Sequence, residues 1–456
     1  MSAFLSTLRQ MRLSLADCET ASHARRRDAR IVQGIMAGFA GRGVAAVVSF
    51  ISVPLTVRYL GAERYGAWVT ISTAMAWIAL ADFGLSNSLT NAVSEGYAKD
   101  DRFLAQSYVA AAFWSLAGIA LVLTLAFFCV WWVIPWDRVF NVQSLLARRE
   151  LAPAVAVAFV IFVLNLPFSI VGKVYGAYQD VATGNAWTAA GNFLGLFALI
   201  TVTRLKGGLV SLVIAVSGAL LIVNVISAIW LFTWSRPWLS PRPGLLTWRA
   251  FHRLSRLGGM LFVIQIAGFV LFQTDNLIIA HYLGASAVTP YSVTWRLFTY
   301  TALFQILASP SYWPAYAEAF ARGDQSWVYR SFRRNLAITL ASTLALAAPL
   351  VLFGRWIIGK WAGNAAVPTG SLLLWMGVWS LIYSAMNAQS CLLASAGRVK
   401  VQMIYSMLAA GVNLVLSIIW VQKFGLTGVI MGTVAAFLIC VVVPQSLQVE
   451  RALQVE

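Results

Sequence analysis

The chain has few charged residues and little of the chemistry that metal sites need. Only 11% of its 456 residues are Asp, Glu, Lys or Arg, against roughly 25% in an ordinary soluble domain. Its three histidines and four cysteines are scattered and do not have the spacing of metal ligands. The low charge excludes a soluble globular protein and a disordered chain. No metal site and no cofactor are expected.

Long apolar runs fill the sequence instead. Hydrophobic residues make up 60% of the chain, and the mean hydropathy is +0.77. An outer-membrane barrel would show alternating segments of about ten residues. The runs here are continuous and reach about 20 residues, the length at which a helix crosses a bilayer. The sequence therefore predicts an all-α polytopic membrane protein.

The net charge of +17 comes from basic residues between the apolar runs. A nucleic-acid-binding protein would gather these residues into a patch or stripe. Because they are spread over connecting segments, no nucleic-acid partner is expected. Cytoplasmic loops of membrane proteins collect Lys and Arg, so the charge indicates how the chain is oriented in the bilayer.

Twelve apolar runs are long enough to cross the membrane, and this even number places both termini on one side. With the termini in the cytoplasm, 21 Lys and Arg residues fall in inner segments and 10 in outer segments, as the positive-inside rule requires. The expected spans are 31–57, 66–92, 105–131, 151–172, 184–203, 208–232, 256–281, 290–313, 334–353, 368–394, 401–421 and 425–446.

The longest inner connection divides the chain near its middle. It covers 233–255 and carries Pro237, Pro241 and Pro243, which are typical of a linker. Five segments are therefore expected. They are a cytoplasmic basic N-terminal segment at 1–30, a six-helix bundle at 31–232, a cytoplasmic linker at 233–255, a second six-helix bundle at 256–446 and a cytoplasmic tail at 447–456.

The two predicted bundles share a repeat at an offset of 223 residues. The sequence YLGA occurs at 59–62 and again at 282–285, and the loop at 95–101 aligns in the same register with 318–324. Between 59–101 and 282–324, 12 of 43 positions are identical without a gap. Two halves with the same orientation are related by an axis along the membrane normal. We therefore expect two parallel six-helix bundles around a central cavity.

Two motifs in the first half carry a resemblance to a known family. The sequence YLGAERYGAW at 59–68 is followed by DFGLSNSL at 82–89. The pair resembles the Wzx-like polysaccharide flippases of the multidrug/oligosaccharidyl-lipid/polysaccharide exporter superfamily. Their pattern is a Leu-Gly-x-x-x-(Tyr/Phe)-Gly turn after the first helix and Asp-x-Gly-Leu in the second. The loops at 95–101 and 394–398 are also similar to that family.

The resemblance implies a flippase with a MATE-like fold. Such a protein moves undecaprenyl-diphosphate-linked oligosaccharide units from the cytoplasmic to the periplasmic face of the bacterial inner membrane, by alternating access. The product serves lipopolysaccharide O-antigen, capsule or exopolysaccharide. The implied partners are the lipid-linked glycan, the lipid bilayer, a polysaccharide polymerase and the chain-length machinery. Coupling to H⁺ or Na⁺ is left open.

Two other function classes compete with the flippase. A cation-coupled drug or metabolite antiporter of the same superfamily is the main alternative. An enzyme such as a polysaccharide polymerase or ligase would resemble its relatives in carrying functional residues on a large outer loop. The longest outer loop expected here, 132–150, offers only a few charged residues, so the sequence argues against an enzyme.

Polar residues inside the predicted spans are the candidates for the site. A charge at the bilayer centre costs about 2.5–3.5 kcal/mol on insertion scales, so it usually faces a bundle interior or a wet cavity. Through the repeat, Arg42 aligns with Gln265 and Asp82 with Gln305, and we expect these four in one cavity. The full set of substrate-binding candidates is Arg42, Asp82, Gln265, Asp275, Arg296, Gln305, Asn91 and Asn165.

Two of these candidates have an expected role. Arg42 is the phosphate ligand, because a guanidinium fork fits phosphate oxygens. Asp82 is the candidate for binding a coupling ion. Both have a structural alternative, which is to pair with each other or to satisfy backbone groups at a bend. Asp275 and Arg296 lie near the outer ends of their spans, where an interfacial position fits equally well.

Overall fold

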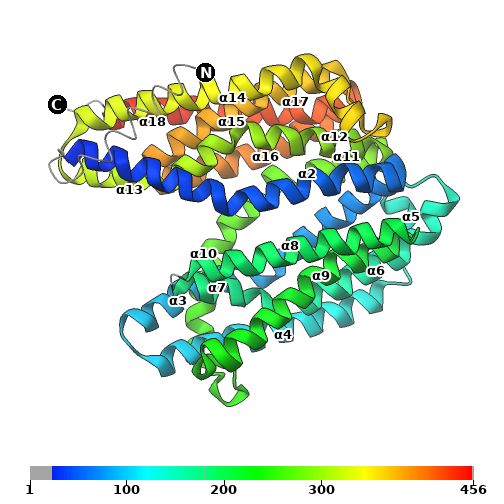
Figure 1. The fold of residues 1–456 in the computed structure, drawn as a ribbon, viewed down its shortest axis with the longest axis horizontal. Coiled ribbons are helices and arrows are strands. Elements are labelled where there is room, and N and C mark those ends of the chain that lie inside the picture. The colour runs from blue at the N-terminus through cyan, green and yellow to red at the C-terminus, as the bar shows by residue number, and fades with distance from the viewer. Residues whose placement is uncertain (1–22, 179, 454–456) are drawn as a thin grey trace. The chain divides into compact units, whose positions relative to one another are not determined.

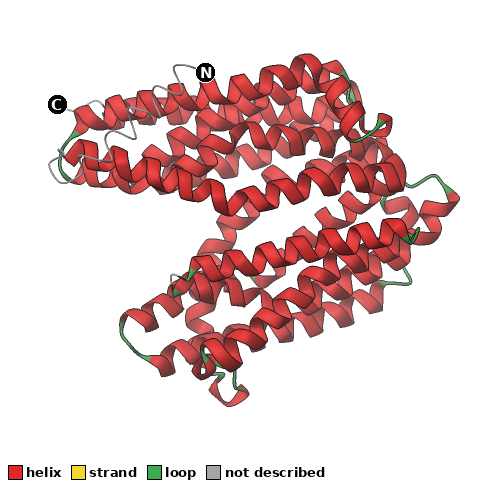
Figure 2. Ribbon diagram, in the orientation of Figure 1, coloured by secondary structure: helices red, strands yellow, loops and turns green. Residues whose placement is uncertain are grey.

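The computed structural model describes the backbone of residues 23–178 and 180–453, and most side chains from residue 46 onward. Within these ranges the regular structure is entirely helical, and short loops join the helices (Figures 1 and 2). The expected all-α polytopic class is confirmed. Most of the predicted basic segment 1–30 lies outside the described residues.

Packing divides the chain into two compact units. The N-terminal unit contains Ala45–Val293 and Gly359–Val367. The C-terminal unit contains Thr294–Ile358, the described residues from Pro368 onward and the α2 residues that precede Ala45. Their limits differ from those of the expected bundles 31–232 and 256–446, because 256–293 packs with the N-terminal unit. The division into five segments stays a prediction.

Three long helices of the N-terminal unit, α4, α6 and α10, begin at polar caps. Asp101, Ser144 and Thr247 each accept a hydrogen bond from the backbone N–H three residues further on, which satisfies one of the free donors at a helix start. The elements are α2 (His23–Ile78), η1 (Ala79–Asp82), α3 (Leu85–Ala98), α4 (Arg102–Val130), α5 (Trp136–Val139), α6 (Leu145–Asn165), η2 (Pro167–Ser169), α7 (Ile170–Ala177), α8 (Val181–Arg204), α9 (Leu209–Trp230), η3 (Leu231–Ser235), η4 (Pro237–Leu239), η5 (Pro243–Leu245), α10 (Trp248–Gln273), α11 (Asp275–Leu283), the first part of α12 (Ala285–Thr299) and η7 (Asn364–Ala366).

The C-terminal unit has its own buried core. Tyr312, Tyr316, Trp327 and Leu392 are among the side chains that form it. Its elements after α12 are η6 (Tyr300–Ala302), α13 (Leu303–Ala321), α14 (Gln325–Trp361), α15 (Gly370–Ser395), α16 (Val399–Phe424), α17 (Leu426–Phe437), η8 (Leu438–Val442) and α18 (Val443–Leu453).

Eight helices in the described part of the chain are long and apolar enough to cross a membrane. A ninth candidate is the pair formed by α6 and Pro167–Ala177, which is bent by 47°. Pro167 removes a helix hydrogen bond there and so favours the bend. The expected spans 256–281 and 290–313 fall on interrupted helices, α10 followed by α11 and α12 followed by η6 and α13. The count by length and apolar composition does not include these two segments. The expected total of twelve spans stays a prediction.

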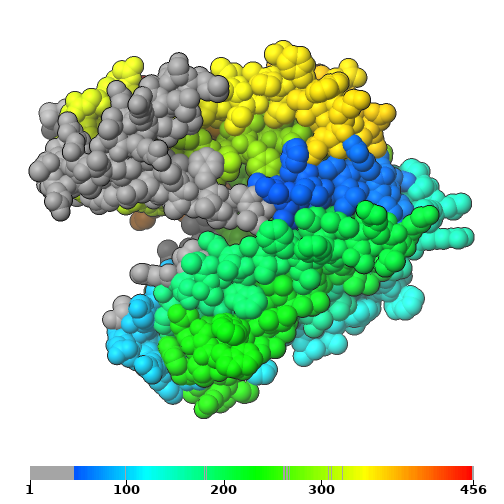
Figure 3. All heavy atoms as spheres, in the orientation of Figure 1, coloured from blue at the N-terminus to red at the C-terminus, as the bar shows by residue number. Residues whose placement is uncertain are grey.

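The face of the N-terminal unit that α8 and α9 form carries exposed apolar side chains. Figure 3 shows the side chains of α8 and α9 over its near face. Phe197 on α8 and Ile222 on α9 are 67% and 52% exposed. Large exposed apolar surface is unusual on a soluble monomer and matches the hydrocarbon region of a bilayer.

The first anchor of the repeat has the same backbone conformation in both copies. Gly61 has φ 76° and ψ 176°, and its counterpart Gly284 has φ 89° and ψ 162°. This region of backbone space is almost restricted to glycine. The two copies of the YLGA sequence therefore form the same interruption of a helix.

The second anchor repeats its hydrogen bonds as well. Asp101 N donates to Gly96 O at 2.9 Å, and Asp324 N donates to Ala319 O at 2.9 Å. Asp101 Oδ1 accepts from Leu104 N and Asp324 Oδ1 from Trp327 N. In both copies a Glu pairs with the basic residue four positions later. The sequence repeat is thus confirmed in its local geometry.

The two copies meet where α2 crosses α12 within the N-terminal unit. A Cβ added at Gly66 would lie 1.7 Å from the carbonyl oxygen of Ala285. Nearby, Thr289 Oγ1 donates to the carbonyl oxygen of Ala62 at 2.5 Å. Ala62 and Ala285 are equivalent in the repeat, and so are Gly66 and Thr289. The contact is therefore reciprocal, as it is at a two-fold axis.

Gly66→Ala should destabilise the protein, because the added methyl group would overlap a backbone carbonyl that no rotamer change can move. Overpacking of this kind costs about 1–3 kcal/mol or more. Gly118→Ala is the matched control, since nothing lies within 4 Å of its added Cβ. Thermal unfolding of the purified variants in detergent provides the measurement. Equal unfolding temperatures for the two variants would contradict the close crossing.

Candidate functional site

A bend between α2 and α3 positions Asp82. After η1, Phe83 and Gly84 adopt left-handed conformations with φ 49° and 73°. Asp82 is buried, and its Oδ1 accepts a hydrogen bond from Gly84 N at 2.8 Å. Asp82 therefore caps the bend, which is the structural alternative left open by the sequence. Its ion-coupling role stays a prediction, and the side chain of Arg42 lies outside the described residues.

Gly84 also sets how closely α3 approaches α10. A Cβ added at Gly84 would lie 2.3 Å from the carbonyl oxygen of Gly258. Only two facing glycines permit this distance between the backbones. The crossing brings the polar residues near the start of α3 against the middle of α10.

A chain of polar side chains links α7, α3 and α10 inside the N-terminal unit. Lys173 Nζ donates to Asn87 Oδ1 at 2.8 Å. Asn87 Nδ2 in turn donates to Gln265 Oε1 at 3.1 Å. All three side chains are half-buried. Among the described residues no carboxylate pairs with Lys173, so its charge is compensated only by an amide oxygen.

Neither Lys173 nor Asn87 is among the residues that the sequence predicts for the site. Lys173 follows the predicted span 151–172 directly and was assigned to an inner loop. In the structure the chain bends at Pro167 and continues as α7, which carries Lys173. Pro167, which stands near the end of that apolar run, is the sequence feature that indicates the bend. Asn87 stands in the motif at 82–89, and its polar side chain inside an expected span was the signal there.

Asp275 forms a second polar cluster in the same unit. It opens α11 and is buried, and one of its oxygens accepts a hydrogen bond from the Tyr291 hydroxyl. The adjacent Asn276 donates to Thr73 Oγ1 at 3.2 Å. In the described part of the chain, Asp275 Oδ1 and Asn276 Oδ1 are buried oxygens without a hydrogen-bond partner. Buried polar atoms of this kind usually have one.

The other candidates have different surroundings within their own units. Asn165 at the end of α6 accepts from Asn224 Nδ2 at 2.8 Å, and Asn91 is exposed on α3. In the C-terminal unit Arg296 is exposed on α12. Gln305 is buried there, donates to Ser309 Oγ at 2.8 Å and accepts from Thr339 Oγ1 at 2.7 Å. The candidates' meeting in one central cavity stays a prediction.

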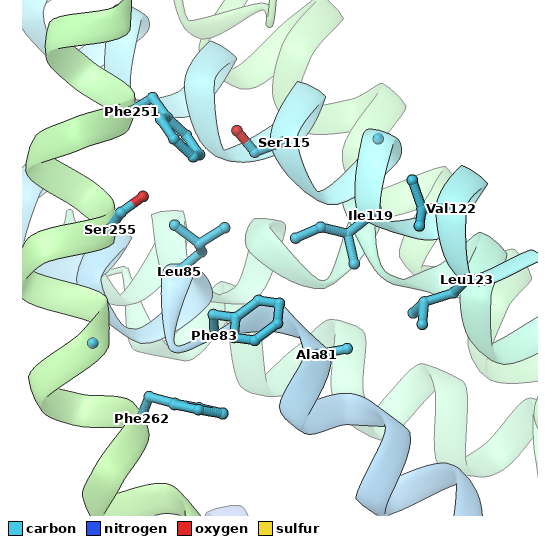
Figure 4. Close-up of a pocket in the computed structure, with 12 residues that line it drawn as sticks. Ala81, Phe83, Leu85, Ser115, Ile119, Val122, Leu123, Phe251, Ser255 and Phe262 are labelled. Carbon is cyan, nitrogen blue, oxygen red and sulfur yellow. The ribbon is translucent and has the colours of Figure 1, made fainter. Parts of the chain in front are cut away.

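An apolar cavity of about 780 Å³ lies between α4 and α10 in the N-terminal unit. Figure 4 shows Phe251 and Phe262 of α10 on one side, Ile119 and Val122 of α4 on the other, and Phe83 between them. The described residues that line this cavity include no charged group, so it suits an apolar ligand.

A basic groove of about 980 Å³ adjoins the start of α10. Trp248, Arg249, His252 and Arg256 are among its lining residues, together with Arg253. Arg253 pairs with Glu95 and lies 5.8 Å from the ring centre of Tyr108. The Lys99 hydrogen bond and the Arg253 charge hold the pKa of Glu95 below its usual value. The carboxylate therefore stays ionised at neutral pH, and the ion pair persists.

Comparisons with known proteins agree on one group. A family model described as "Polysaccharide biosynthesis protein" matches residues 31–317, and the MatE model matches 261–419. A "Putative O-antigen export protein" of Yersinia pseudotuberculosis is 22% identical over 88% of this chain and 91% of its own length. A "Putative O-antigen transporter" of Salmonella typhimurium is 23% identical over 87% and 91%.

Solved structures show the same fold. An inward-facing multidrug resistance MATE family transporter of the MOP superfamily superposes with a TM-score of 0.76 at 14% identity, over 89% of this chain and 95% of its own. A MOP superfamily transporter from Pyrococcus furiosus gives a TM-score of 0.62 at 15% identity, over 94% and 97%. At these identities the likeness establishes the fold, which confirms the expected MATE-like architecture. Together with the first family model, which covers more than half of the sequence, it shows that the chain belongs to the polysaccharide biosynthesis protein family.

Proposed function

We propose that the protein is a flippase for undecaprenyl-diphosphate-linked oligosaccharides. It carries repeat units from the cytoplasmic to the periplasmic face of the inner membrane by alternating access, for O-antigen or a related surface polysaccharide. The family match and the names of the Yersinia and Salmonella relatives support the polysaccharide part. Both termini are cytoplasmic in this proposal, and a polysaccharide polymerase with its chain-length machinery receives the product.

The half-buried ammonium group of Lys173 is the observation that carries this proposal. It lies among apolar helices and makes one hydrogen bond within the described part of the chain, to the side-chain oxygen of Asn87. An ammonium group has three donors, so two remain for an anionic ligand such as a diphosphate. The amides of Asn87 and Gln265 suit the hydroxyl groups of a sugar. Arg42 is proposed as a second phosphate ligand.

Asp275 is the better acid for binding a coupling H⁺ or Na⁺. One oxygen of Asp82 is already used by Gly84 N at the bend. Asp275 has a buried oxygen without a partner among the described residues, and so does the next residue, Asn276. A cation or a proton at Asp275 would remove the cost of that unsatisfied buried group.

The alternative is a cation-coupled antiporter for drugs or metabolites. It is favoured by the TM-score of 0.76 with a multidrug resistance transporter. Substrate release separates the two functions, because a flippase must let the lipid tail remain in the bilayer while the glycan crosses. The glycan assay below distinguishes them directly.

Deletion of the gene should leave complete lipid-linked repeat units on the cytoplasmic face of the inner membrane and abolish the surface polymer. The measurement is extraction of polyprenyl-linked glycans, with their sidedness probed in inverted and right-side-out vesicles. Complementation with the intact gene is the control. Unchanged glycans together with new sensitivity to cationic drugs would instead establish the antiporter.

Lys173→Gln should slow glycan export by about 10- to 100-fold, since a hydrogen bond to a charged group contributes about 1.5–3 kcal/mol. Lys173→Arg should keep much of the activity because it retains the charge. Lys423→Gln removes an exposed lysine at the end of α16 and is the matched control. Polymer output at equal protein levels provides the measurement. Normal export by Lys173→Gln would remove this lysine from the phosphate site.

Asp275→Asn should abolish any dependence of transport on a proton or sodium gradient, because the amide binds neither ion as a carboxylate does. Asp82→Asn should keep that dependence, since an amide oxygen can still accept from Gly84 N. Transport in vesicles with imposed gradients provides the measurement. A loss of coupling in Asp82→Asn alone would return the role to Asp82.

A further inference from the structure

The start of α10 carries two adjoining features that the proposed transport does not use. The residues that line the apolar cavity recur there at helical spacing: Phe251, Ser255, Gly259 and Phe262. Arg249, His252 and Arg256 of the basic groove occupy the neighbouring side of the same turns. One stretch of helix thus presents cations next to an opening for an apolar chain.

The cations of the groove are available to an anion. Arg253 is engaged by Glu95. In the described part of the chain, Arg249 and Arg256 pair with no carboxylate, and both side chains are exposed. Guanidinium groups bind phosphate oxygens through two parallel hydrogen bonds. The groove therefore fits a headgroup with a net negative charge better than a zwitterionic or neutral one.

The cavity opens onto the surface of the N-terminal unit. Phe83 and Val122 line it and are 55% and 64% exposed. Its apolar lining would bind water poorly. Leu121 and Leu125 on α4 are also exposed, so the surface of that helix is apolar. A hydrocarbon chain in the bilayer is the ligand that this position offers.

We propose that the start of α10 is a binding site for an anionic diacyl phospholipid. Its headgroup phosphate lies on Arg249 and Arg256, and one acyl chain enters the cavity between α4 and α10. The charge of the groove agrees with this occupant. The linker that leads into α10 is basic and is expected at the cytoplasmic surface, where anionic lipids bind basic pockets between helices. Trp248 is exposed at the helix start, as interfacial tryptophans are.

The headgroup is tested by native mass spectrometry of the purified full-length protein, titrated with phosphatidylglycerol or phosphatidylcholine. The Arg249→Gln/Arg256→Gln variant should bind phosphatidylglycerol about 10- to 30-fold more weakly, as expected for two cations at a membrane surface. Arg330→Gln/Arg333→Gln removes two exposed arginines from α14 and should bind normally. Equal binding of the two lipids, or an equal loss in both variants, would overturn the proposal.

The position of the acyl chain is tested with the wild-type protein and with a variant in which a side chain fills the cavity. Dihexanoyl phosphatidylglycerol should bind more weakly than the dipalmitoyl lipid. Gly118→Leu places a larger side chain in the cavity, where nothing lies within 4 Å of its Cβ, and should lower affinity for the long-chain lipid only. Chain-independent binding would overturn the cavity assignment. If undecaprenyl phosphate bound there and phosphatidylglycerol did not compete with it, the site would belong to the transport substrate. That result would also overturn the phospholipid assignment.

Discussion

The crossing of α2 and α12 is the contact on which the N-terminal unit depends. Lipid is as apolar as the helices, so close packing and hydrogen bonds replace the hydrophobic effect between spans. Gly66 lets the backbone of α2 reach the Ala285 carbonyl, and Thr289 adds a hydrogen bond to Ala62. Both helices also supply residues to the C-terminal unit. The family motif around Gly66 therefore has a packing explanation that is independent of any substrate.

A second constraint explains where the polar residues lie. Backbone groups in the hydrocarbon region must be hydrogen-bonded within the protein, so each interruption of a helix needs a local partner. Asp82 supplies one for Gly84 at the bend before α3. The bend at Pro167 leads into α7, whose Lys173 contacts Asn87. The bends thus place polar side chains among apolar helices, where continuous helices would have left them at the membrane surface.

Much of the fold could be predicted from the sequence, since it depends on local patterns. Apolar run length predicts helices, and the repeat predicts that Gly61 and Gly284 share a backbone conformation, as they do. The site was less predictable. Lys173 stands just beyond an apolar run, so a count of run lengths assigns it to a loop. The unsatisfied oxygen of Asp275 follows from packing against distant segments, which no local pattern records.

The repeat also shows why equivalent positions need not share a role. Asp82 and Gln305 align at the offset of 223, yet Asp82 caps a bend and Gln305 bonds Ser309 and Thr339 near the start of α13. Backbone geometry at the anchors is fixed by residues inside the repeat, such as Gly61 and Asp101. Side-chain partners differ between the halves: Asp82 accepts from Gly84 N within its own copy, whereas Gln305 also accepts from Thr339 Oγ1, which lies outside the repeat. The repeat therefore supports a shared backbone conformation more strongly than it supports a substrate site built from aligned residues. An asymmetric site fits a glycan whose two ends, diphosphate and sugar, differ in chemistry.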